Sequence, residues 1–236
     1  MSAGDHIRPC ADTSEMSWVA PDLRPFADGI GSLVPRVFEA YARLLHPAEG
    51  ERDSPIRWSA VAAWSGGVVH ALAEFEPMAR PRGPAPSARP YVKPPADGRL
   101  APATLAALCD VLADHTTTPD QCYFGVWEGY GWIPQAARSA ARLELPERTH
   151  LMFRGPLSRV ADIGSHLGGW FRQESPSIIF PADRSWFTAT DVDLDSTFVG
   201  GSRDLIGALL GDDRLEAWPA SPTDPITAAS DRINRS

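Results

Sequence analysis

The chain of 236 residues has few cysteines, a single lysine and no long hydrophobic run. Its three cysteines, Cys10, Cys109 and Cys122, leave one thiol over under any pairing and show no Cys-x-x-Cys spacing. Neither a disulfide framework nor a structural zinc site is therefore expected. The histidines are scattered without a His-x-x-x-His pair, which argues against a zinc site on a helix. No cofactor is expected.

The absence of long apolar runs also bears on the cellular location of the protein. No segment reaches the roughly 20 apolar residues of a membrane helix, and residues 1–16 lack the hydrophobic region of a signal peptide. We therefore expect a cytoplasmic protein. A net charge of -8 disfavours non-specific electrostatic binding to nucleic acid or to an anionic membrane. An acidic chain favours a basic protein partner, and the oligomeric state stays open.

What is present is enough hydrophobic material, 43% of the chain, for a packed core. The patterns predict an α+β fold, a single domain with a mixed, mostly antiparallel sheet of about five or six short strands and helices packed on one face. We expect a mobile segment over 1–16, the domain over 17–218 and a polar tail over 219–236. Whether translation starts at Met1 or at Met16 stays open. A proline-rich connection spans 77–102.

Apolar spacing places the expected elements along the chain. Helices are predicted over 35–45, from Ser54 to Gly66, over 102–114 and from Pro156 onward. Short strands are predicted at 122–127, 143–146, 150–153 and 177–180.

The most structured stretch runs from Arg184 to Gly211. Over 186–195 the even-numbered positions are all apolar or β-branched, whereas the odd-numbered positions change from apolar to acidic. This alternation predicts a strand that leaves the core and presents three carboxylates to water. These carboxylates are Asp191, Asp193 and Asp195.

A turn and a helix are expected after this strand. Gly200 and Gly201 predict the turn, because glycine adopts backbone angles that are closed to other residues. Ser202 is placed to cap the helix, and Gly211 stands where a left-handed C-cap is expected.

Three interpretations of this unit are open. Carboxylates roughly 6–7 Å apart on a strand can share a hard cation. However, Ser196 and Ser202 stand where a calcium loop needs glycine and glutamate. The amides of 200–203 could bind an anion, although a phosphate-loop lysine is missing. The third interpretation, which the pattern favours, is an acidic strand edge that resists pairing, followed by an ordinary helix cap.

A second candidate surface lies in the sequence QCYFGVWEGYGW, where aromatic residues surround Glu128. A carboxylate between indole rings can be desolvated and used in ligand binding. It is as easily a rim residue paired with an arginine. The candidate ligand-binding residues are therefore Trp127, Glu128, Tyr130, Trp132, Asp191, Asp193 and Asp195.

The segments 124–129 (FGVWEG), 151–156 and 191–201 (DVDLDSTFVGG) resemble those of a family of soluble proteins from high-GC bacterial genomes. The resemblance extends over about two thirds of the chain and implies no particular activity. In size, acidity and aromatic-rich strands the chain is also similar to α+β immunity proteins, which neutralise bacterial toxins.

Two classes of function follow. The first is a non-catalytic, immunity-like binding module with an aromatic and acidic surface for a basic partner. The second is a metal-assisted hydrolase that uses Asp191, Asp193, Asp195 and Glu128. Metal chemistry requires at least two of these carboxylates to converge on one point in a cleft. Catalytic residues are not assigned, and whether the protein is an enzyme stays open.

Overall fold

The computed structural model describes residues 6–84, 88–167, 169–227 and 230–235. Nine strands within these residues form one sheet: β1 (Arg8–Pro9), β2 (Ala40–Leu45), β5 (Cys122–Trp127), β6 (Arg142–Leu145), β7 (Arg148–Gly155), β10 (Ile178–Pro181), β11 (Phe187–Ala189), β12 (Ser196–Gly201) and β13 (Ala217–Ala220). Their order is β1-β7-β5-β10-β11-β12-β2-β13, with β6 on β7, and the pairs are antiparallel. The α+β prediction holds, but the sheet exceeds the predicted five or six strands.

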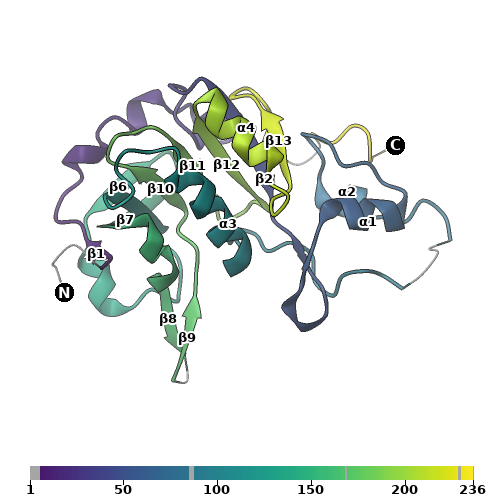
Figure 1. The fold of residues 1–236 in the computed structure, drawn as a ribbon, viewed down its shortest axis with the longest axis horizontal. Helices are drawn as coiled ribbons and strands as arrows, with labels where there is room; N and C mark the ends of the chain where they lie inside the picture. Colours follow the sequence, from purple (N-terminus) through teal and green to yellow (C-terminus); the bar gives the residue numbers. More distant parts are fainter. Residues whose placement is uncertain (1–5, 85–87, 168, 228–229, 236) are drawn as a thin grey trace.

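The other elements surround this sheet (Figure 1). Two small hairpins are β3 (Ala48–Glu49) with β4 (Pro55–Ile56), and β8 (Gly164–Leu167) with β9 (Trp170–Gln173). The α-helices are α1 (Trp58–Ser65), α2 (Phe75–Met78), α3 (Pro102–Ala113) and α4 (Arg203–Gly211). Short 3-10 helices are η1 (Ser14–Met16), η2 (Ala20–Asp22), η3 (Ile30–Ser32), η4 (Glu51–Asp53), η5 (Gln135–Ser139) and η6 (Leu157–Asp162). Among the described helices, none has the length and apolarity to cross a membrane.

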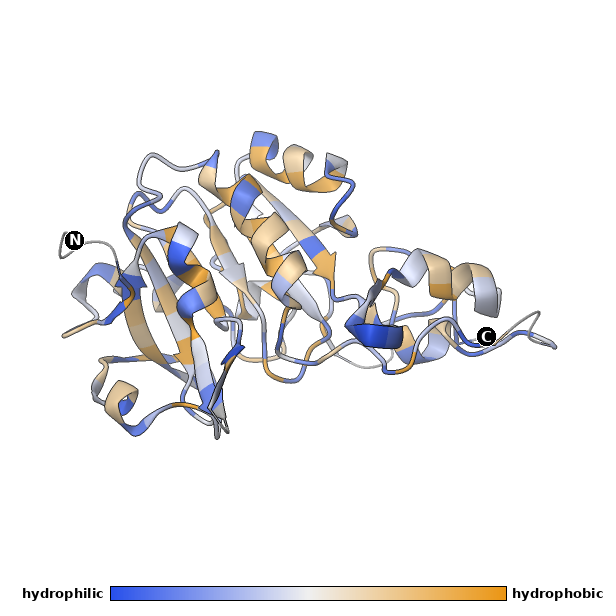
Figure 2. Ribbon diagram, turned by 60° about the horizontal axis from the view of Figure 1, so that its bottom comes forward, coloured by the Kyte–Doolittle hydropathy of each residue, from blue (hydrophilic) through white to orange (hydrophobic). Residues whose placement is uncertain are grey.

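Both faces of the sheet are covered. Helices α3 and α4 pack on one face, where they share a hydrophobic cluster with Phe124 and Ile179. The N-terminal segment containing η1 and η3 covers the other face, where it packs on Phe180 and Phe187. Figure 2 shows hydrophobic residues along the strands of the sheet and along the helices beside it. The central strands are consequently buried on both sides, and every residue of β12 is buried.

Several predicted elements are confirmed. Helix α3 buries the expected stripe of Leu105, Leu108, Cys109 and Leu112. The strands predicted at 143–146 and 150–153 form the hairpin β6–β7, and those at 122–127 and 177–180 form β5 and β10. The helix expected from Ser54 begins later, at Trp58, because Pro55 and Ile56 pair with β3.

The predicted helix over 35–45 is wrong. Ala40–Leu45 is strand β2, which pairs with both β12 and β13. Tyr41 faces one cluster, whereas Ala42 and Leu44 face the other. A strand buried on both faces has no polar alternation, so its apolar residues matched helical spacing by chance.

The long strand predicted over 186–195 is also wrong. Alternation holds through β11, but the chain then turns at 191–195 and returns as β12. Asp191 drives this turn, because its Oδ1 accepts the amide of Asp193 at 3.1 Å and its carbonyl accepts the amide of Leu194. The acids therefore lie on a hairpin turn and not along a strand edge.

The glycines after this turn have a packing role. Gly200 and Gly201 lie inside β12, where a Cβ would come within 2.5 Å of Phe38 and 2.6 Å of Leu205 respectively. Ser202 caps α4 as predicted, accepting the amide of Leu205. Gly211 is the last residue of α4 and does not form the predicted left-handed cap, since Asp212 follows with φ -81°.

Described residues near both ends of the chain belong to the packed structure. Cys10 and Met16 are buried, although the first sixteen residues were expected to be mobile; residues 1–5 lie outside the described part. In the predicted tail, Pro219 belongs to edge strand β13, while Asp231 and Asn234 are buried. The N-terminal contacts come from isolated apolar residues and the C-terminal contacts from polar ones, so neither segment shows an apolar period in the sequence.

A smaller unit lies to one side of the sheet, formed by α1, α2 and the last described residues (Figure 1). Trp58, Phe75 and Met78 are fully or almost fully buried in its hydrophobic cluster. Gly66 ends α1 in a left-handed conformation, φ 77°. The proline-rich connection then leads from α2 to α3. Its described residues between 79 and 101 form neither helix nor strand, apart from one β-bridge between Lys93 and Glu49. Residues 85–87 lie outside the described part.

Candidate functional site

A cavity of about 480 Å³ lies between the sheet and the smaller unit. Its lining comes from residues 71–80 and 94–97, from the 193–196 turn and from the C-terminal segment, together with Ile30, Arg43 and Phe198. Its charged lining residues are Arg43, Glu74, Glu76, Arg80, Asp97, Asp193, Asp195 and Arg235. The cavity thus exists only in the folded chain, at the meeting of segments far apart in sequence.

Arg43 ties the two sides of this cavity together. It projects from β2, and its Nη1 donates to the carbonyl oxygens of Ala71 at 3.1 Å and Ala73 at 2.8 Å. Its Nε donates to Ser196 at 2.8 Å, and its Nη2 lies 3.3 Å from Asp195. Because every nitrogen of the guanidinium has a partner within the chain, the charge of Arg43 is already neutralised and its side chain is structural.

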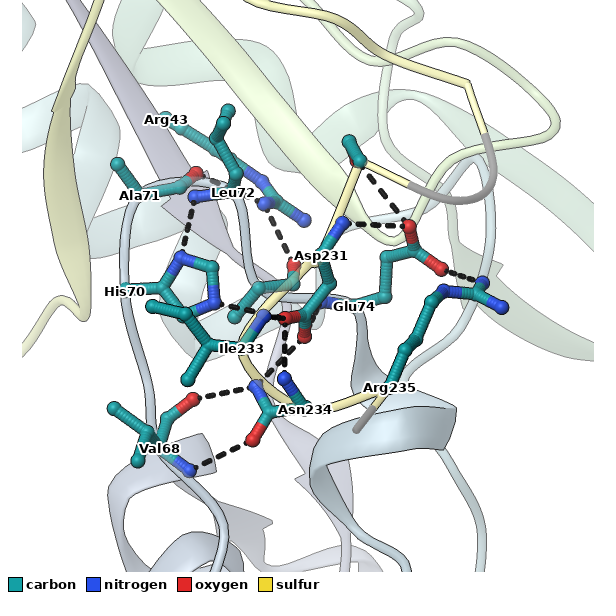
Figure 3. Close-up of polar contacts among 12 residues, drawn as sticks. Arg43, Val68, His70, Ala71, Leu72, Glu74, Asp231, Ile233, Asn234 and Arg235 are labelled. Carbon is teal, nitrogen blue, oxygen red and sulfur yellow. Dashed lines mark hydrogen bonds and ion pairs between the residues drawn. The ribbon is translucent and has the colours of Figure 1, made fainter.

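The C-terminal segment forms another wall and is held by Asp231, whose side chain is fully buried (Figure 3). Its carboxylate accepts from His70 at 3.0 Å, from the Glu74 amide at 3.0 Å and from both the amide and the side chain of Asn234. Burial raises the pKa of Asp231, but the hydrogen bonds from Asn234, Glu74 and His70 outweigh it and lower the pKa to about 2. The segment is therefore a built part of the cavity.

Replacing Asp231 with alanine is expected to detach the C-terminal segment from the cavity. The lowered pKa corresponds to roughly 2 kcal/mol of stability, which is complete above the unfolded-state pKa of about 3.8 and is lost as the pH falls toward 2. At neutral pH the Asp231→Ala variant should unfold at a lower urea concentration than wild type. A protease should also cleave it faster near its C-terminus. The neighbouring exposed residue supplies the control, Arg232→Ala, which should behave like wild type. Equal cleavage of all three proteins would contradict this role.

The turn at 191–195 is fixed from the other side by Arg148. Its Nε and Nη2 bind both oxygens of Asp191, at 2.9 and 3.1 Å, and Nη2 also lies 2.7 Å from Asp193. The guanidinium stacks over Phe26 at 4.7 Å from the ring centroid. Asp191 is buried, whereas the Asp193 side chain is 75% exposed. One positive charge faces two carboxylates, so this group keeps a net negative charge.

Asp97 adds a further negative charge next to the 191–195 turn. It lines the cavity from the proline-rich connection and has no ion-pair partner among the described residues. Burial, and then the negative charges of Asp195 and Asp193, raise the pKa of Asp97. The three carboxylates therefore repel one another at one end of the cavity.

A comparison of the chain with models of protein families, with curated proteins and with solved structures gives no match. The function must therefore be argued from the site itself.

The aromatic residues predicted as ligand-binding form a separate group. Tyr130 stacks on Trp132 and meets Trp127 edge-on, with ring centroids 5.6 and 5.3 Å apart. Its hydroxyl donates to the carbonyl of Gly98 at 2.9 Å, which anchors the proline-rich connection. Glu128 pairs with Arg142 at 3.0 Å on the surface. None of these residues lines the 480 Å³ cavity.

Of the seven predicted site residues, the structure brings only Asp193 and Asp195 to the cavity. Sequence reasoning missed Arg43 and Asp97, which lie in a misassigned strand and in the proline-rich connection, and no local motif marks them. The Asp231-x-x-Asn234 spacing was a usable signal, because an aspartate often binds backbone amides that follow it.

The carboxylates proposed for metal chemistry do not gather at one point. Asp191 and Asp193 bind Arg148, Asp195 binds Arg43, and Glu128 binds Arg142. Over residues 6–84, 88–167, 169–227 and 230–235, no group of three or more His, Cys, Asp or Glu side chains is arranged to hold a metal ion. Within the described residues, the four carboxylates therefore do not form the metal site that the hydrolase hypothesis requires.

Proposed function

We propose that this protein is a non-catalytic binding module that receives a cationic group of a basic protein partner in the 480 Å³ cavity. The observation that supports this most directly is the acidic corner of Asp97, Asp193 and Asp195, where Asp97 lacks a cation of its own within the described chain. An arriving ammonium or guanidinium would relieve the repulsion among these carboxylates.

The balance of charge favours this ligand class. Five carboxylates and three guanidinium groups line the cavity. Arg43 is neutralised by Asp195 and Arg235 by Glu74, which leaves the carboxylates of Asp97, Glu76 and Asp193 against the single guanidinium of Arg80 in the lining. Asp193 shares Arg148 with Asp191, so this pairing does not remove the excess of negative charge. The carboxylates of the acidic corner attract a cation and repel an anion.

The size and walls of the cavity suit a long side chain. Volumes of roughly 300–1,000 Å³ are usual for binding pockets. Apolar walls are available from Leu194, Phe75 and Phe198, together with Pro94 and Pro95. The aliphatic part of an arginine or lysine can lie along these walls while its charged end reaches the carboxylates.

Fluorescence anisotropy with labelled peptides tests this proposal. An octapeptide alternating arginine and glycine should bind at low ionic strength and weaken as salt is added, whereas the same peptide with glutamate should not bind. The double variant Asp97→Asn with Asp193→Asn should bind the arginine peptide at least about tenfold more weakly, since two charge-assisted contacts are lost. A lysine peptide shows whether the planar guanidinium is needed.

The matched control is Asp120→Asn. This exposed residue precedes β5 near the β10–β11 turn, whereas the acidic corner lies at the β11–β12 turn, at the other end of the strands. It removes one negative charge far from the cavity and should leave affinity nearly unchanged. If the control weakens binding as much as the cavity variants do, attraction is only to the net charge and the proposed site is wrong. Binding that survives both cavity substitutions would mean the same.

A further inference from the structure

The hairpin β8–β9 carries the most exposed large hydrophobic side chain in the described part of the chain. Trp170 is 81% exposed and its neighbour Phe171 is 46% exposed. The hairpin is a separate two-stranded sheet, and it projects away from the body of the molecule in Figure 1. The outer edges of both strands pair with no other described strand. Exposed aromatic groups on an unpaired hairpin are typical of a contact surface.

An apolar cavity of about 450 Å³ opens at the base of the same hairpin. Gly164, the first residue of β8, lines it together with Val126, Trp132, Phe153 and Ile163. Ala136, which is exposed on η5, also belongs to its lining. Trp132 is thus one of the candidate residues, but it faces this second cavity and not the acidic one.

We propose that two copies of this chain associate about a two-fold axis, with Trp170 of each copy inserted into the 450 Å³ cavity of the other. A projecting indole and an apolar cavity on one chain make a self-complementary surface, which a two-fold dimer requires. Trp170 cannot fill the cavity of its own chain while the hairpin stays extended. It pairs with Leu167 at the tip, three residue steps, or roughly 10 Å, from the pair Gly164–Gln173 at the base.

The direction of the hairpin also fits this arrangement. When two hairpins lie side by side about a two-fold axis perpendicular to their strands, they run antiparallel, so each tip lies at the base of the other. The cavity is at the base and Trp170 at the tip, so both contacts form together. The unpaired strand edges can add backbone hydrogen bonds across the axis.

The expected contact is small. A tryptophan buries roughly 150–250 Å². Two copies of Trp170 and Phe171, with the walls that they cover, bring the total to about 1,200 Å², the lower limit for specific interfaces. A dimer with a dissociation constant in the micromolar range is therefore expected, in exchange with the monomer.

Sedimentation velocity of the full chain over a range of concentrations tests this association. Wild type should shift from monomer to dimer. Trp170→Ala removes the inserted side chain, and Ala136→Trp fills the cavity; each should raise the dissociation constant about 100-fold or more, as expected when a central aromatic contact is lost twice. The control is Leu210→Ala on α4, a side chain 40% exposed, which should dimerise like wild type.

Mixing the two variants guards against misfolding. The Trp170→Ala chain keeps an open cavity and the Ala136→Trp chain keeps its indole, so the mixture can form one intact contact and should associate more than either variant alone. A wild type that stays monomeric, a dimer that persists in Trp170→Ala, or a mixture that gains nothing would each overturn the proposal. Asp97 and the acidic cavity take no part, so this association and peptide binding can fail separately.

Discussion

Replacing Arg148 with methionine is expected to remove roughly 3–5 kcal/mol of folding free energy. Arg148 is the partner of Asp191, which is buried, and the substitution leaves that carboxylate charged without a cation. It also removes the stacking of the guanidinium on Phe26 and frees Asp193. Urea unfolding at neutral pH, followed by tryptophan fluorescence, measures the loss.

The same hairpin offers a matched control. Arg142 pairs with Glu128 at a similar distance, 3.0 Å, but these side chains are 50% and 39% exposed. Arg142→Met should therefore change stability by no more than about 1 kcal/mol. Adding Asp191→Asn to Arg148→Met removes the unpaired charge and should restore part of the loss. Equal effects of Arg148→Met and Arg142→Met would show that water reaches Asp191 and that the turn is not held by a buried pair.

Acidification from pH 6.5 to 4 is expected to destabilise the protein through two buried histidines. Burial lowers the pKa of His46 to about 4, although a hydrogen bond to the carbonyl of Ala96 opposes this. Burial likewise lowers the pKa of His150 to about 4, against the opposing charge of Asp191. Between about 6.5 and 4 the unfolded chain binds a proton at each histidine that the folded chain does not, so stability falls with pH by about 3 kcal/mol per histidine.

His150→Leu tests this directly. His150 is 5% exposed, and its Nδ1 has no hydrogen-bond partner among the described residues, so an apolar side chain of similar size should be tolerated at neutral pH. The variant should lose about half of the pH dependence between 6.5 and 4, because only His46 remains. His6→Gln, an exposed position, should keep the wild-type slope. A His150→Leu slope equal to that of wild type would mean that His150 is solvated when protonated. Asp231 does not contribute in this window, since its effect is lost only below about 3.8.

How far the sequence predicts the fold depends on whether a segment is covered on one side or on both. Helix α3 faces the core on one side, so its stripe of Leu105, Leu108 and Leu112 identifies it directly. Strand β2 lies between β12 and β13 and is buried on both faces, so its residues show no polar period. The strand pairing that selects β2 involves residues more than 150 positions away, and no local pattern contains it.

The candidate site depends even more on the fold. The sequence marks Asp191, Asp193 and Asp195 as a group, yet the turn sends them to different partners, Arg148 for the first two and Arg43 for the third. Ion pairs between residues this far apart in the sequence leave no periodic pattern, so the sequence does not reveal which arginine each aspartate binds. Asp97 comes beside them only because the proline-rich connection passes the 191–195 turn, where the amide of Gly98 donates to the carbonyl of Leu194.

By itself, the sequence determined the class of the fold, the one-sided helix α3, the strands of the hairpin β6–β7 and the acidity of the chain. These follow from local periodicity and from composition, which each short segment carries alone. Only the tertiary structure decided which carboxylates are neutralised, which aromatic side chains are buried and where a cavity remains. Those outcomes require charges and surfaces from distant segments to meet, and the free energy of each contact exists only once the chain has folded.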